Sequence, residues 1–226
     1  MKKLASLLLL STLGMSSLAN ADVRITEWMY NTDNKKSGEF FELTNFGSDA
    51  VDFFNWSYDD DSRIPGTFSL ASFGIVNPGE SVIVTELDAT AFRTLWNLAA
   101  NTKVIGLLSV NLGREDEINI YNGNVLVDRL TYNDKESNGP RTSGIGGVPG
   151  SWAAVGAHQA SGWVLSQLGD AEGSVLSNAG DIGSPGRSAY AYVAAVPEPS
   201  TYAMLVAGLV LMGFTAYRRR RDKFKV

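Results

Sequence analysis

The stretch EINIYNGNVLVDRLTY at 117–132 constrains the fold of this chain more than any other part of its sequence. Apolar and polar residues alternate on both sides of its central Asn122-Gly123 pair, as they do in strands with one buried face. An Asn-Gly pair accepts the positive backbone angles of a type I′ turn, which joins neighbouring antiparallel strands. The stretch therefore predicts a β-hairpin in which Ile118 and Ile120 share one face. Their expected partners across the hairpin are Val125 and Val127.

Four further runs rich in β-branched and aromatic residues are bounded by turn residues, and each predicts a strand. These runs are VRITEWMY at 23–30, EFFELTNF at 39–46, AVDFFNWSY at 50–58 and SVIVTEL at 81–87. One helix is predicted to begin after Asp88, whose side chain can cap it. Phe92, Leu95 and Trp96 then lie on one side of this helix. Several strands, one helix and no regular alternation of the two predict an all-β fold, an antiparallel β-sandwich.

Residues 136–187 are richer in Gly, Ser and Ala than the preceding part of the chain, which is typical of loops. They also contain Trp152 and Trp163, and a disordered linker has no need of such large apolar residues. We expect this stretch to wrap around the sandwich as long loops. One domain would then cover residues 22–187, and a linker would follow at 188–196.

The first 21 residues have the organisation of a secretory signal peptide. Two lysines precede an apolar stretch at 4–18, and Ala19 and Ala21 place small residues at a cleavage site. We expect signal peptidase to cut after Ala21, so that the rest of the chain is exported.

The exported part is acidic, since residues 22–196 contain 11 basic and 22 acidic residues. A net charge of this sign repels phosphate backbones and argues against nucleic-acid binding. The chain has no cysteine and a single histidine, His158. Disulfides, thiolate zinc sites, cysteine nucleophiles and multi-histidine metal sites are therefore excluded, and we expect no cofactor.

The chain ends with an apolar run and a basic cluster. Residues 202–217 contain no charged side chain, and Arg218, Arg219, Arg220 and Arg221 follow directly. A helix of this length spans ~24 Å, which is shorter than the ~30 Å hydrocarbon core but can cross a locally thinned bilayer. We expect a single transmembrane helix, with the arginines stopping it on the cytoplasmic side.

Residues 22 to about 133 resemble a lamin tail domain in the order of their motifs. These motifs are ITEWMYN at 25–31, GEFFELTNFGSDAVDFFNW at 38–56, NPGESVIVTE at 77–86 and EDEINIYNGNVLVDRLTY at 115–132. The resemblance implies an immunoglobulin-like β-sandwich that serves as a binding or structural module rather than an enzyme.

The last 30 residues are similar to a PEP-CTERM sorting signal, because Pro197, Glu198 and Pro199 precede one apolar run and a terminal arginine cluster. The resemblance implies a Gram-negative bacterium and processing by an exosortase near this Pro-Glu-Pro sequence. It also implies an inner-membrane intermediate, delivery to the cell envelope, outer surface or extracellular matrix, and a link to exopolysaccharide or biofilm. An exopolysaccharide or a surface protein is then the expected ligand.

Two other functions remain open. Glu27, Glu39 and Glu42 include carboxylates at spacings that a glycoside hydrolase could use. Residues 39 and 42 differ by an odd number, however, and so face opposite sides of a strand. The simpler interpretation is that these glutamates bind backbone amides. Asp59, Asp60 and Asp61 cluster as calcium ligands do, which would suit a calcium-dependent adhesin, but they lack the spacing of a calcium loop.

Two weaker candidate sites involve aromatic residues and serines. Exposed aromatic residues could stack on sugars, and Trp28, Tyr30 and Trp56 are candidates for this role. Ser143 or Ser151 could pair with His158 as nucleophile and base, but no Gly-x-Ser-x-Gly motif surrounds either serine.

Overall fold

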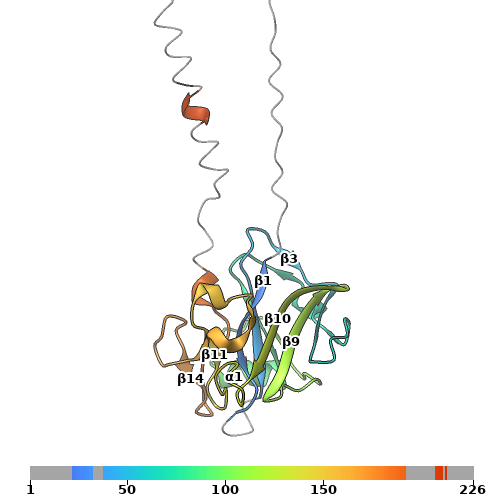
Figure 1. Cartoon of the computed structure of the whole chain (residues 1–226), viewed down its shortest axis with the longest axis vertical. Coiled ribbons are helices and arrows are strands. Elements are labelled where there is room, and N and C mark those ends of the chain that lie inside the picture. Colours follow the sequence, from blue (N-terminus) through green and yellow to red (C-terminus); the bar gives the residue numbers. More distant parts are fainter. Residues whose placement is uncertain (1–21, 33–37, 192–206, 211, 213–226) are drawn as a thin grey trace, which may run out of the picture.

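A computed structural model describes residues 22–32, 38–191, 207–210 and 212 of the 226-residue chain. Two β-sheets form the body of the molecule (Figure 1). The first sheet has the order β13 (Trp163–Leu165), β11 (Gly147–Pro149), β1 (Val23–Met29), β2 (Phe40–Asn45), β7 (Ser81–Thr85) and β8 (Val104–Ile105). The second has the order β12 (His158–Gln159), β10 (Val125–Asn133), β9 (Glu115–Asn122), β4 (Trp56–Asp59) and β5 (Phe68–Ser69).

Smaller elements complete the fold. Two short ladders pair β3 (Val51–Asp52) with β6 (Ile75–Val76), and β14 (Val175–Leu176) with β15 (Ile182–Gly183). The α-helix of the domain is α1 (Ala89–Leu95), and the 3-10 turns are Ala71–Phe73, Trp152–Ala154 and Ala160–Gly162. The predicted all-β sandwich with one short α-helix is confirmed.

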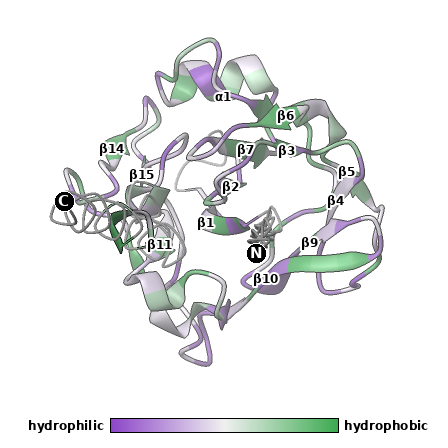
Figure 2. Cartoon of the chain, turned by 90° about the horizontal axis from the view of Figure 1, so that it is seen from above, coloured by the Kyte–Doolittle hydropathy of each residue, from purple (hydrophilic) through white to green (hydrophobic). Residues whose placement is uncertain are grey.

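The two sheets pack face to face around an aromatic core. Figure 2 shows β1, β2 and β7 in the centre, with β4, β9 and β10 to one side. Trp28 on β1 is fully buried, and its ring lies 5.0 Å from Trp163 and 5.3 Å from Tyr132. Alternate residues of β2, β4, β7 and β9 point into this core, as the sequence pattern predicts. In β1 a register shift between Ile25 and Glu27 makes Trp28 the next core residue after Ile25.

The other face of the first sheet is also covered. Helix α1 packs Phe92 and Trp96 against Phe40 of β2, with ring centroids 5.3 and 5.8 Å apart. Asp88 caps the helix, because its carboxylate accepts hydrogen bonds from the Thr90 and Ala91 amides at 2.9 and 3.2 Å. Both the predicted cap and the predicted buried side of the helix are confirmed.

The hairpin at 117–132 forms, but its register differs from the prediction. Asn122 pairs with Val125, so the two-residue loop is Gly123–Asn124 rather than Asn122–Gly123. Only Gly123 has a positive φ, at 58°, which fits a type II′ turn. A bulge after Leu126 then shifts the pairing. Ile120 lies opposite Asp128 and Ile118 opposite Leu130, so neither predicted valine is a direct cross-strand partner. Val125 is exposed, whereas Val127 packs against the core that contains Ile118 and Ile120, as the prediction of a shared face requires.

The run 50–58 gives two strands rather than one. Phe53, Phe54 and Asn55 separate β3 from β4, and the Trp56 amide donates a hydrogen bond to the Phe53 carbonyl at 3.0 Å. The turn lets the chain pass from the small β3–β6 ladder into the second sheet.

Residues after 136 wrap around the sandwich and add strands to both sheets. Strands β11 and β13 join the first sheet, and β12 joins the second. We name residues 182–191 the C-terminal strap. Its last part lies against the domain where the sequence predicted a linker. The Ala189 amide donates to Glu172 at 2.5 Å, and the Tyr190 hydroxyl donates to the Pro149 carbonyl at 3.2 Å.

Two predictions concern the ends of the chain. The predicted signal peptide at 1–21 lies outside the described residues. Residues 207–210 are helical, but no helix among the described residues is sufficiently long and apolar to cross a membrane.

Candidate functional site

The three glutamates considered as acid–base residues do not share one open site. Glu27 on β1 lies directly opposite Glu42 on β2, on the sheet face away from the sandwich core. Glu39 precedes β2, and its carboxylate accepts a hydrogen bond from the Leu112 amide at 3.1 Å. Glu39 and Glu42 thus fail to form a pair, as the strand alternation predicts.

The C-terminal strap covers the carboxylates of Glu27 and Glu42. The Ser184 amide donates to both oxygens of Glu27, at 3.0 and 3.1 Å. The Gly186 amide donates to one oxygen of Glu42 at 2.6 Å, and the Thr26 hydroxyl donates to the other at 2.6 Å. Glu27 is 1% exposed and Glu42 is 0% exposed. The predicted binding of backbone amides is confirmed for all three glutamates.

Burial also decides the protonation of this pair. It raises the pKa of Glu27 well above its ordinary value, and the neighbouring Glu42 charge adds to the effect. Burial likewise raises the pKa of Glu42 to about 8, with Glu172 contributing a further carboxylate charge. Two buried carboxylates this close do not both ionise readily, so the pair keeps at least one proton at neutral pH.

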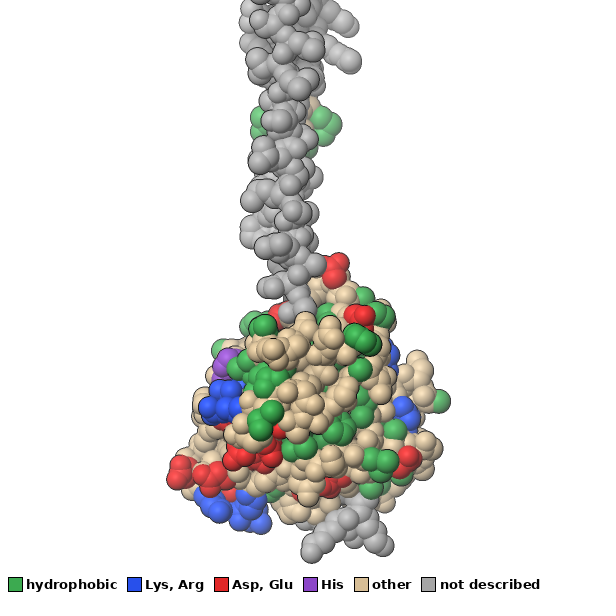
Figure 3. Space-filling view, turned by 90° about the vertical axis from the view of Figure 1, so that its right-hand side faces the viewer, with side chains coloured by type: hydrophobic (Ala, Val, Ile, Leu, Met, Phe, Trp, Pro, Cys, Tyr) green, Lys and Arg blue, Asp and Glu red, His purple; other side chains and the backbone are tan. Residues whose placement is uncertain are grey.

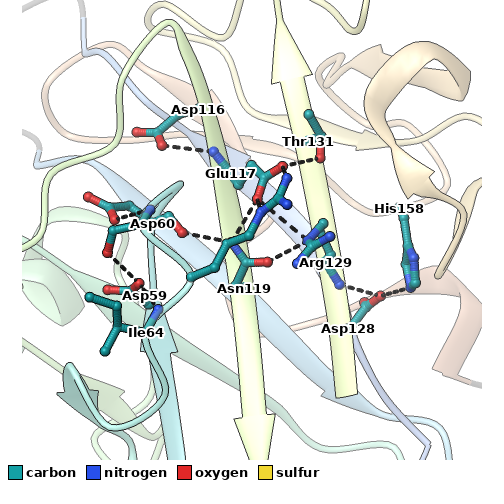
Figure 4. Close-up of polar contacts among 12 residues, drawn as sticks. Asp59, Asp60, Ile64, Asp116, Glu117, Asn119, Asp128, Arg129, Thr131 and His158 are labelled. Carbon is teal, nitrogen blue, oxygen red and sulfur yellow. Dashed lines mark hydrogen bonds and ion pairs between the residues drawn. The ribbon is translucent and has the colours of Figure 1, made fainter. Parts of the chain in front are cut away.

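The acidic run Asp59–Asp61 makes hydrogen bonds within its own turn. Asp59 accepts from the Ser62 hydroxyl at 2.7 Å and from the Ile64 amide at 2.5 Å, and Asp60 accepts from the Ser62 amide at 3.0 Å (Figure 4). Within the described part of the chain, no group of three or more acidic or histidine side chains is placed to hold a metal ion. The geometry therefore gives no support for calcium at this turn.

A polar network covers the outer surface of the second sheet, with Glu117 at its centre (Figure 4). Arg63 donates two hydrogen bonds to the Glu117 carboxylate, at 2.6 and 2.7 Å. Asn119 and Thr131 each donate one at 3.0 Å, and Arg129 forms an ion pair at 3.5 Å. The Arg63 hydrogen bonds are the main cause that lowers the pKa of Glu117 to about 2. Glu117 is thus held ionised, and it orders this surface instead of donating protons.

The single histidine has an acidic neighbour but no nucleophile. His158 Nε2 lies 3.6 Å from Asp128 Oδ1 (Figure 4). The Ser143 hydroxyl accepts a hydrogen bond from Asn31, and neither Ser143 nor Ser151 bonds to His158 among the described contacts. The serine–histidine arrangement is therefore not formed.

The exposed aromatic residues are not those named from the sequence. Trp28, Tyr30 and Trp56 are 3% exposed or less, so their proposed stacking on sugars was wrong. Phe54 is 73% exposed and Trp152 is 47% exposed. Phe54 lies beside a pocket of about 300 Å³ at the turn end of β4.

Comparison with known families identifies the domain. The lamin tail domain profile matches residues 16–134, more than half of the chain. The chain belongs to the lamin tail domain family. The PEP-CTERM protein-sorting motif matches residues 195–221. No curated protein and no solved structure matches the chain.

The structure explains two residues of EDEINIYNGNVLVDRLTY, one of the motifs that resemble a lamin tail domain. Asp128 accepts a hydrogen bond from the Ile25 amide at 2.9 Å, which joins the late hairpin to the first strand. Tyr132 places its ring against Trp28 in the core. Neither contact could be predicted from the motif, because each joins residues more than 100 positions apart.

The lamin tail domain match ends at residue 134, whereas described contacts continue to residue 191. The later residues supply β11, β13 and the C-terminal strap, which the family pattern does not cover. The expected processing residues Ala19, Ala21, Pro197, Glu198 and Pro199 lie outside the described residues, as do Arg218 to Arg221.

Proposed function

We propose that this protein is an exported, non-catalytic binding module of the cell surface or extracellular matrix. The observation that carries the proposal is the sorting motif at 195–221 in a chain with a lamin tail domain. The PEP-CTERM motif implies processing by an exosortase and export to the cell envelope or surface.

Binding is favoured over catalysis by the state of the acidic residues. Glu27 and Glu42 are buried under the C-terminal strap, where a substrate has no access to them. Glu39 bonds to a backbone amide, and Glu117 is held ionised by Arg63. None of these groups combines an open position with a free carboxyl, which acid–base hydrolysis of a glycosidic bond requires.

The finer steps of the proposal concern the ends of the chain. Signal peptidase removes residues 1–21 after Ala21. The apolar run 202–217 holds an inner-membrane intermediate of a Gram-negative cell, with Arg218–Arg221 in the cytoplasm. The exosortase then acts near Glu198, and the released domain joins the exopolysaccharide or biofilm at the surface.

Intact mass spectrometry of the protein recovered from cells tests the sorting steps. We expect a species that begins at Asp22 and ends near Glu198. Substitution Glu198→Ala should shift recovery to a species that retains the tail. A wild-type protein that extends to Val226 would contradict processing by the exosortase and make the tail an ordinary anchor.

A turnover assay on extracted exopolysaccharide tests the absence of catalysis. We expect no new reducing ends from the wild-type protein. Release of product that is abolished by Glu27→Gln, Glu39→Gln or Glu42→Gln would contradict the binding-module proposal and establish a hydrolase.

A further inference from the structure

The pocket beside Phe54 is uncharged, although the domain around it is acidic. Nine residues line its volume of about 300 Å³, and none carries a charge. They include Phe54, Asn55, Ser57, Gly66 and Asn124. Small-molecule sites in proteins begin at about this volume. A pocket without charged groups gives no electrostatic gain to an ionic ligand, so a neutral one is favoured.

Backbone contacts hold the pocket open and fix its shape. The Gly123 amide donates to the Asn55 carbonyl at 2.9 Å, which ties the β9–β10 turn to the turn before β4. The Phe54 amide donates to the Asp52 carboxylate at 3.0 Å. On the other wall, the Gly66 amide donates to the Ser57 hydroxyl at 2.9 Å. A site formed in advance costs a ligand less ordering entropy.

The groups left free in this pocket combine an aromatic surface with neutral polar atoms. The Phe54 ring is 73% exposed. The side-chain amides of Asn55 and Asn124 are exposed and make no hydrogen bond within the described part of the chain. Each amide can both donate and accept. Figure 3 views the side of the molecule that carries β4, β5, β9 and β10, where apolar side chains run through the middle and charged ones gather towards the lower left.

A sugar ring matches this combination, since it has a face of C–H groups and a rim of neutral hydroxyl groups. We propose that this pocket binds a neutral sugar unit of a polysaccharide, with Phe54 stacking on the ring and the amides of Asn55 and Asn124 bonding its hydroxyls. The inference rests on the proposed function and names the ligand class. Trp152, the other exposed aromatic residue within the described ranges, instead packs against Phe46 and Tyr190.

Isothermal titration calorimetry on the full-length protein tests this site. The protein is kept in a polyoxyethylene detergent, because sugar-headed detergents would compete for the pocket. The probes are neutral pentasaccharides of glucose, galactose, mannose and N-acetylglucosamine, with a galacturonic acid pentamer as the anionic comparison. We expect saturable binding of at least one neutral probe.

Variants locate the binding. Phe54→Ala should weaken it roughly tenfold or more, whereas Phe54→Tyr keeps the ring and should retain it. Asn124→Ala removes about one hydrogen bond and should weaken binding about fivefold. Trp152→Ala is the matched control, since it deletes an exposed aromatic ring elsewhere, and it should bind as the wild type does.

Three results would overturn the proposal. They are no saturable binding of any neutral probe, binding that Phe54→Ala leaves unchanged, and tighter binding of the anionic pentamer. The intact mass of the protein recovered from cells distinguishes this failure from a failure of the proposed function. If binding fails in one of these ways but the protein still begins at Asp22 and ends near Glu198, the sugar site is refuted and the sorting steps are not.

Discussion

Substitution Glu42→Gln tests the role of the buried carboxylate pair. Glu42 accepts hydrogen bonds from the Thr26 hydroxyl and the Gly186 amide. A glutamine keeps both contacts, because its carbonyl oxygen can accept from Gly186 and its amide can donate to the Thr26 hydroxyl. The substitution therefore leaves the packing in place and removes the titrating group.

The size of the effect follows from the pKa of Glu42. Burial raises this pKa from 4.5 to about 8. As pH rises, the unfolded chain loses this proton first, so the stability that protonated Glu42 contributes is fully present below pH 4.5 and is lost as pH approaches 8. At about 1.4 kcal/mol per pH unit, the total is of the order of 5 kcal/mol. That is a large share of the ~5–15 kcal/mol by which domains are usually stable.

Urea unfolding at several pH values between about 5 and 9 measures this effect. We expect the free energy of unfolding of the wild type to fall more steeply with pH than that of Glu42→Gln, by roughly 1.4 kcal/mol per unit. Since the variant does not lose this contribution, it should become the more stable protein as pH rises through this range, with the full difference reached near pH 8. Glu39, whose pKa burial also raises to about 8, contributes equally to both curves.

A charge-matched control separates this effect from a general change in net charge. Glu115 is exposed at the start of β9, and Glu115→Gln should keep the wild-type slope. Parallel curves for the wild type and Glu42→Gln would refute the reasoning, because they would mean that Glu42 ionises alike in the folded and unfolded states.

Three further predictions concern the core, the helix and the polar network. Trp28→Ala deletes a fully buried ring, and we expect it to lower the free energy of unfolding by about 3–5 kcal/mol in urea titrations. Asp88→Ala removes both helix-capping hydrogen bonds, and the same measurement should show a loss of about 1 kcal/mol. Arg63→Ala removes the main cause of the low pKa of Glu117, about 2. Ionised Glu117 contributes stability that is lost as pH falls from its ordinary value towards 2, and circular dichroism should show acid unfolding of the variant at a higher pH.

The parts of the fold that could be predicted from the sequence depend on local signals. The cap at Asp88 and the buried side of α1 are separated by only a few residues, so the chain specifies them almost alone. The hairpin was recognised for the same reason. Its register could not be predicted in the same way, because the loop lies one residue later than the Asn-Gly pair indicates and the bulge after Leu126 shifts the pairing again. Beyond the bulge, Asp128 accepts a hydrogen bond from the Ile25 amide, a contact between residues 103 positions apart that no local signal shows.

The candidate sites were harder to predict, because distant contacts decide their chemistry. The sequence suggested that Glu27 and Glu42 bind backbone amides, but not which ones. Ser184 lies 157 positions after Glu27, and Gly186 lies 144 positions after Glu42. The exposure of Phe54 could not be predicted either. The run AVDFFNWSY predicts one continuous strand, whereas the structure has a turn at residues 53–55 that contains Phe54.

The buried pair also bears on how the sorting motif is presented. Contacts of the C-terminal strap continue to Tyr190 and the described domain to residue 191, so only residues 192–196 separate it from Pro197. Five residues reach at most about 18 Å. Burial disfavours the ionised form of both glutamates. Loss of a proton from Glu27 or Glu42 would therefore favour an opened strap in which water reaches the carboxylates, although the Ser184 and Gly186 amides bond an ionised carboxylate more strongly. A strap freed from residue 182 onward would more than double the length of chain before the motif. A proton on this pair therefore helps to keep the C-terminal strap on the domain as well as stabilising the fold itself.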